Sequence, residues 1–180
     1  MRFAVVALAF IAASFAASPA HADVVTATPS AFELRASQTV PTSPERAWNA
    51  LIRIGDWWGS EHTYSGNGRN MRLDARPGGC WCERWRGGGI EHGRVLLVMN
   101  HEGVRTLRIE APLGPLQEMA VNGILTFTVA PDPAGAKIDM TYRVSGDASL
   151  ALDHVGPGVN NVMMEQYGRL VRLVTSGSPG

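Results

Sequence analysis

The sequence has few cysteines, few lysines and no excess of charge. Only 2 of its 180 residues are Cys, and 16 Lys and Arg residues balance 16 Asp and Glu residues. A disulfide-rich scaffold is thereby excluded, and the charge balance gives no reason to expect nucleic acid as a partner. Lys137 is the single lysine, so nearly all cationic residues are Arg. This preference for Arg over Lys is more typical of GC-rich codon usage than of phosphate recognition. With 45% hydrophobic and 18% charged residues, the chain is too apolar to be disordered and suits one domain.

The first 22 residues have the pattern of a secretory signal peptide. Met1 and Arg2 form a short positive start, residues 3–17 are apolar, and Ala20-His21-Ala22 matches an A-x-A cleavage site. The apolar run is shorter than the roughly 20 residues that a spanning helix needs. We therefore expect cleavage after Ala22, no membrane span in the mature protein, and a periplasmic or secreted location.

Residues 23–31 are predicted to form a disordered leader, followed by a single domain over residues 32–176. Ser43 and Pro44 predict the N-terminus of a short helix that ends at Gly55. Alternating apolar and polar residues predict antiparallel strands with one buried face at 32–40, 71–75, 80–86, 90–99, 104–111, 121–129 and 137–144.

The last element has a helical period. After the segment 156–158 (Gly-Pro-Gly), apolar residues recur at spacings of three and four from Val159 to Val174, which predicts one long amphipathic helix. A curved antiparallel sheet of about seven strands covered by this helix is an α+β fold.

The order of these elements and several local motifs are similar to those of a known family. The matching segments are 40–48 (VPTSPERAW), the pair Trp57-Trp58, Pro77-Gly78-Gly79 leading to Glu83, Gly93 with Val95, 113–116 (LGPL) and 141–146 (TYRVSG). Over residues 32–175 the chain resembles the START-related, SRPBCC or polyketide cyclase-like superfamily, which has the helix-grip fold. The resemblance implies a deep hydrophobic cavity between sheet and helix. It specifies the activity poorly, because this superfamily includes lipid carriers, cyclases, hydroxylase subunits and activators of a chaperone ATPase.

The strand at 80–86 is compatible with two orientations. In one, Cys82, Arg84 and Arg86 point inward, which would bury two cations without evident partners. In the other, a bulge at Gly78-Gly79 reverses the alternation, so that Trp81, Glu83 and Trp85 point inward. The second orientation is favoured, and it makes Glu83 a candidate acid or base whose pKa burial would raise. The alternative is a surface Glu83 paired with a neighbouring Arg.

Cys80 and Cys82 are expected to be two small apolar side chains on one face of the sheet, and the sequence leaves their redox state open. In a regular strand their Cα atoms would lie roughly 6.6 Å apart, close to the upper limit for a disulfide. A redox role, or a metal site with His92 as third ligand, is the alternative, although no fourth ligand is evident. We therefore predict no metal and no cofactor.

Apolar and aromatic side chains are the candidates for lining a ligand cavity, although each could equally fill a core. Together with Glu83, these candidates are Trp57, Trp58, Tyr64, Met71, Trp81, Trp85, Met119, Phe127, Met140, Tyr142, Met163 and Tyr167.

Motifs for catalysis are scarce. His62, His92, His101 and His154 are scattered, and Glu91-His92 and His101-Glu102 resemble solvated residues beside turns. We therefore expect a binding protein for a small hydrophobic molecule or lipid rather than an enzyme. A cyclase or dehydratase acting on a hydrophobic, polyketide-like substrate, with Glu83 or a His as general acid or base, is the first alternative. A protein-binding module without a ligand is the second. No feature of the sequence specifies an oligomeric state.

Overall fold

A computed structural model of the chain describes residues 23–180, so the predicted signal peptide lies outside the described residues. Eight strands form one antiparallel sheet in the order β1-β2-β8-β7-β6-β5-β4-β3. They are β1 (Asp23–Thr28), β2 (Ala31–Val40), β3 (Met71–Leu73), β4 (Cys80–Trp85), β5 (Gly88–His101), β6 (Val104–Glu110), β7 (Asn122–Asp132) and β8 (Gly135–Ser145). The two α-helices of this region are α1 (Pro44–Ile52) and α2 (Leu152–Ser176). The predicted α+β fold is confirmed.

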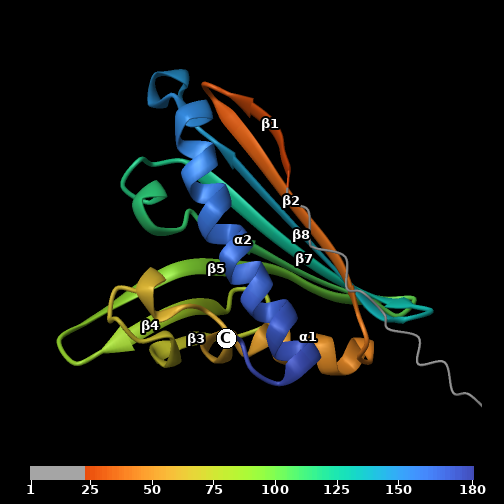
Figure 1. Cartoon of the computed structure of the whole chain (residues 1–180). Coiled ribbons are helices and arrows are strands. Elements are labelled where there is room, and N and C mark those ends of the chain that lie inside the picture. The colour runs from red at the N-terminus through yellow and green to blue at the C-terminus, as the bar shows by residue number, and fades with distance from the viewer. Residues whose placement is uncertain (1–22) are drawn as a thin grey trace, which may run out of the picture.

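The sheet is open and strongly curved. Strands β1, β2, β8 and β7 run side by side, whereas β5, β4 and β3 turn away from them at the other end, and α2 crosses one face of the sheet (Figure 1). Short 3-10 helices occupy the connections: η1 (Ile54–Asp56), η2 (Ser60–His62), η3 (Gly68–Asn70), η4 (Gly114–Leu116) and η5 (Ala148–Leu150). No helix within residues 23–180 has the length and apolar character needed to cross a membrane.

The predicted patterns account for most of these elements. Every second residue of β8, from Ala136 to Val144, is buried, as its alternation predicts. Ser43 caps α1, because its hydroxyl accepts a hydrogen bond from the backbone N–H of Arg46. On α2, Met163, Tyr167 and Leu170 are buried, and the Tyr167 hydroxyl donates to the carbonyl oxygen of Ile138 on β8 at 2.7 Å.

The structure differs from the predicted elements at both ends of the domain. Residues 23–28, expected in a disordered leader, form β1, which pairs with β2; Val and Thr in this segment favour a strand, and β2 offers an open edge. Helix α2 begins at Leu152 rather than after Gly158, so Pro157 lies inside it. The missing N–H of Pro157 removes one helical hydrogen bond, but the extra turns bury Leu152 and place Gly156 against the ring of Phe32.

Candidate functional site

A cleft of 560 Å³ lies between the first half of α2 and the connections that face it. Its walls come from residues 58–64, from η4 and the residue before it, from β5 and from α2. The lining residues are mainly apolar: Trp58, Tyr64, Leu113, Gly114, Pro115, Val155, Gly158, Val159, Val162 and Met163, with Glu61, His62, Thr63 and His92 as polar members. This volume and this composition are typical of small-molecule sites.

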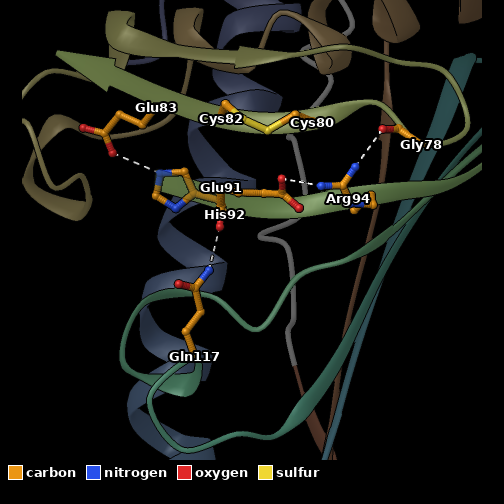
Figure 2. Close-up of a disulfide and its surroundings, with 8 residues drawn as sticks. All are labelled: Gly78, Cys80, Cys82, Glu83, Glu91, His92, Arg94 and Gln117. Atoms are coloured by element: carbon orange, nitrogen blue, oxygen red, sulfur yellow. Dashed lines mark hydrogen bonds and ion pairs between the residues drawn. A yellow bond between two sulfur atoms is a disulfide. The ribbon is translucent and has the colours of Figure 1, made fainter. Parts of the chain in front are cut away.

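His92 is the buried polar residue of the cleft, and a bulge in β5 places it there. Across the β4–β5 ladder, Trp81 pairs with Gly93 and Cys82 pairs with Glu91, so His92 is an extra residue without an opposite partner. The bulge interrupts the alternation, and the two consecutive residues His92 and Gly93 are both buried. Gln117 donates to the carbonyl oxygen of Glu91 at 2.7 Å, which joins the bulge to the segment after η4 (Figure 2).

The prediction that His92 is solvated is therefore wrong. Counting back from the inward-facing Val95, strict alternation places His92 on the outer face. The inserted residue reverses that assignment, and His92 is only 4% exposed. His101, by contrast, lies exposed at the end of β5, as predicted.

Glu83 lies on β4 beside His92 and is completely buried. His92 Nε2 is 3.0 Å from Glu83 Oε2 (Figure 2). The same carboxylate accepts the backbone N–H of Tyr64 at 3.1 Å and that of Ser65 at 2.6 Å. Glu83 therefore joins three parts of the site: β4, the His92 bulge and the connection that carries Tyr64.

The hydrogen bonds of Glu83 decide its charge. Burial alone would raise the pKa of Glu83, but the hydrogen bonds from Ser65, Tyr64 and His92 outweigh burial and lower that pKa. The predicted raised pKa is therefore wrong, because the sequence does not show the donors that surround this carboxylate. Burial also lowers the pKa of His92, although Glu83 opposes this effect.

These two directions define the protonation of the pair near neutral pH. An ionised Glu83 can only accept hydrogen bonds, so Nε2 of His92 carries the proton that it donates. A neutral imidazole with a protonated Nε2 has a lone pair on Nδ1. No partner for Nδ1 is found among the described residues, so the cleft contains a hydrogen-bond acceptor whose orientation Glu83 fixes.

Aromatic rings pack around the pair. The ring centroid of Trp81 lies 4.9 Å from that of Trp58, in an edge-to-face arrangement, and 5.7 Å from that of His92. Trp81 is fully buried, and its indole N–H has no acceptor within residues 23–180. These contacts surround the imidazole with apolar rings and account for the effect of burial on its pKa.

Polar side chains join η2, which forms part of the cleft wall, to α2. His62 Nε2 lies 3.3 Å from Glu165 Oε2 on α2. A buried amide joins the same two segments, because Gln166 Oε1 accepts the backbone N–H of Gly59 at 2.7 Å. The segment 59–62 is therefore joined to α2 at both of its ends.

The structure brings together only some of the predicted ligand-binding residues. Trp58, Tyr64 and Met163 line the cleft, and Trp81 and Glu83 lie directly behind His92. Most of the others belong to the buried core or pack against it: Trp57, Met71, Met119, Phe127, Met140, Tyr142 and Tyr167. Trp85, expected to face inward, lies at the end of β4 and is 36% exposed.

The favoured orientation of β4 is confirmed for Trp81 and Glu83, which are both buried, whereas Arg84 is exposed. The bulge lies on β5 at His92, however, rather than at Gly78-Gly79. Gly93 is required next to it, because a Cβ atom there would lie 2.6 Å from the carbonyl oxygen of Glu110.

Cys80 and Cys82 form a disulfide, so the favoured prediction of two small apolar side chains without a bridge is wrong. Their Cα atoms lie 5.4 Å apart, well within the range for disulfides and closer than in a regular strand. The contracted segment of β4 coincides with the irregular pairing to β5. The alternative metal site with His92 is also wrong. The imidazole of His92 lies on the inner face of the sheet, hydrogen-bonded to Glu83, whereas both sulfur atoms belong to the disulfide on the outer face.

Sequence reasoning missed several parts of the cleft. The helical stripe included Val159 and Val162 but not Val155. The segment 113–115 was recognised as part of the matching motif 113–116 and not as a wall of the cleft. Consecutive burial at a bulge has no period, so no sequence signal indicated that His92 is buried. The Gly-rich stretch before it was the single indication of irregular pairing.

Comparison with known proteins supports the fold of the chain but gives no information on its chemistry. No family model matches the chain, and no curated protein matches its sequence. Among solved structures, the chain is similar to protein Ms6760 from Mycobacterium smegmatis, with 12% identity, a TM-score of 0.55, and coverage of 89% of this chain and 98% of that one. It is also similar to MLL2253 from Mesorhizobium loti, with 17% identity and a TM-score of 0.53, and to CV1439 from Chromobacterium violaceum, with 20% identity and a TM-score of 0.51. Each of these two matches covers 79% of this chain and 96% of the other. At these identities the likeness shows a shared α+β fold of curved sheet and C-terminal helix.

Proposed function

We propose that the protein is an exported binding protein that holds a small, mainly apolar molecule in the cleft beside α2. The observation that carries this proposal is a 560 Å³ space with mostly apolar walls and one buried, oriented imidazole. Apolar walls supply affinity by removing apolar surface from water, and a single fixed polar group orients the bound molecule.

The polar group defines the chemistry of the ligand. Because Nδ1 of His92 is an acceptor, the matching ligand has a hydroxyl or N–H group at one end of an apolar body. Placing that group against Nδ1 would satisfy a nitrogen that has no partner among the described residues. A lipid-like alcohol or phenol meets these conditions, whereas a carboxylate would face both the lone pair of Nδ1 and the nearby charge of Glu83.

Two further observations support this proposal. The segment 1–22 has the pattern of a signal peptide, which would deliver the protein to the periplasm or the medium. The resemblance to the START-related and SRPBCC superfamily, proposed here as the family of this chain, implies a ligand cavity on the same side of the sheet as α2.

Two substitutions at Gly158 test the binding function. A Cβ atom at Gly158 would meet no atom within 4 Å, although this residue lines the cleft. Gly158→Phe should therefore obstruct the cleft without disturbing the core, and Gly158→Ala is the matched control. Protein purified from its own host should release an apolar molecule on organic extraction in the wild type and in Gly158→Ala, but not in Gly158→Phe. An empty wild-type cleft would overturn the proposal.

The His92–Glu83 pair favours one second candidate, a cyclase or dehydratase acting on a hydrophobic substrate. With Nε2–H held by an ionised carboxylate, Nδ1 can accept a proton from a bound substrate, and Glu83 stabilises the imidazolium that forms. His92→Gln should then abolish turnover of a polyketide-like substrate while leaving its binding within a few-fold of wild type. Unchanged turnover in both His92→Gln and Glu83→Gln would remove this candidate.

A further inference from the structure

The Cys80–Cys82 disulfide lies directly across from the bulge that turns His92 inward. Along β4, Cys80 pairs with Arg94 and Cys82 pairs with Glu91, so two residue steps on β4 face three on β5. The disulfide is on the outer face of β4, next to the ion pair of Glu91 and Arg94, and Glu83 follows immediately on the inner face (Figure 2).

The contraction of β4 and the insertion in β5 are complementary. The Cα atoms of Cys80 and Cys82 are 5.4 Å apart, compared with roughly 6.6 Å for the same spacing in an extended strand. Opposite this contracted segment, β5 has one residue more than regular pairing needs, and that residue is His92. The disulfide therefore favours the backbone geometry that brings His92 Nε2 to Glu83.

A purely stabilising role explains this disulfide poorly. The entropic gain from a disulfide grows with the length of the loop that it closes, and here the loop contains a single intervening residue, Trp81. Strand β4 is already paired on both sides, with β3 and β5. Both cysteines are partly exposed, unlike Trp81 between them.

We infer that Cys80 and Cys82 form a reversible redox switch that controls the geometry of the His92–Glu83 pair. A thiolate of an external dithiol attacks one of the two sulfur atoms and forms a mixed disulfide, and the other cysteine leaves as a thiolate that takes up a proton. The second thiol of the reductant then releases the remaining cysteine and closes the reductant's own disulfide. Two electrons and two protons reach the protein, and β4 becomes free to extend.

In the reduced protein, the extended β4 pairs more regularly with β5, and His92 moves away from Glu83. This step deepens the proposed function, because it makes the orientation of Nδ1 in the cleft depend on the redox state. The carboxylate keeps its backbone donors from Tyr64 and Ser65, so the fold of the site survives while its polar group is displaced.

Nuclear magnetic resonance of the imidazole of His92 tests the switch without any ligand. In the oxidised protein, the Nε2–H of His92 should give a resolved signal that exchanges slowly with water. Adding dithiothreitol should accelerate this exchange at least tenfold, and reoxidation should restore the slow rate. The double variant Cys80→Ser, Cys82→Ser should show the fast rate with and without dithiothreitol, while the circular dichroism of all forms stays that of a folded protein.

Two results would overturn the inference. One is an identical His92 signal in the oxidised protein, the reduced protein and the double variant. The other is loss of the folded circular dichroism signal on reduction, which would show that the disulfide only stabilises the fold. Neither result bears on whether an apolar molecule co-purifies with the protein, so the switch and the proposed binding function fail independently.

Discussion

His92 Nε2 and Glu83 Oε2 lie 3.0 Å apart in a buried site, and an extra residue in β5 is what makes this contact possible. The carboxylate also accepts two backbone N–H groups from the connection that carries Tyr64. One side chain therefore orients the imidazole and fixes a wall of the cleft.

Replacing the carboxylate should destabilise the protein. In Glu83→Gln, one amide oxygen must serve three donors, and the new NH₂ group faces donors instead of acceptors. We expect a loss of about 3 kcal/mol in the free energy of unfolding, measured by urea denaturation. The matched control is Glu91→Gln, which removes an exposed ion pair with Arg94 and should cost less than about 1 kcal/mol. Equal stability of the two variants would contradict the assigned role of Glu83.

Stability should decrease in acid because of the same pair. The pKa of His92 is lowered in the folded state, so the unfolded chain, with a pKa of about 6.5, binds the proton first as the pH falls. The free energy of unfolding should therefore decrease as the pH falls below about 6.5. Glu83, whose pKa is also lowered, adds a further decrease below its unfolded pKa of about 4.3.

Denaturation of the wild type and of His92→Gln between pH 4 and pH 8 measures this dependence. The variant lacks the imidazole, so its stability should change less between pH 6.5 and pH 4.5. Identical pH profiles for the two proteins would show that His92 is not held neutral by burial.

Tyr142 should support the cleft from behind rather than contact a ligand. Its hydroxyl donates to the carbonyl oxygen of Ala111 at 2.7 Å and accepts the backbone N–H of Leu113 at 3.2 Å. Tyr142→Phe leaves both backbone groups without this partner and should cost about 1–3 kcal/mol of stability by thermal or urea denaturation. Tyr64→Phe is the control, because Tyr64 is 54% exposed and its hydroxyl makes no hydrogen bond with residues 23–180. A neutral Tyr142→Phe would contradict this role.

The sequence predicts the parts of the fold that follow a regular period. Alternation identified β7 and β8 with their buried faces, and the residue pair Ser43-Pro44 located the start of α1. These elements depend on local patterns of burial and capping, which one sequence shows directly.

The candidate site depends instead on departures from regularity. His92 is buried because of one inserted residue, the cysteines approach because β4 is contracted, and Glu83 is ionised because of donors contributed by residues 64 and 65. Each of these features arises from pairing between segments, so no period or composition reveals it. The inward orientation of Trp81 and Glu83 was predictable because the opposite orientation would have buried two arginines.

The central claim is that the cleft holds an apolar molecule, and mass spectrometry of organic extracts from protein purified in its own host tests it most directly. Gly158→Phe places a ring at the cleft, whereas Gly158→Ala adds one methyl group in open space. We predict one apolar compound in equimolar amount with the wild type and with Gly158→Ala, and at least tenfold less with Gly158→Phe. Absence of any such compound from the wild type, or equal amounts in all three proteins, would contradict the account.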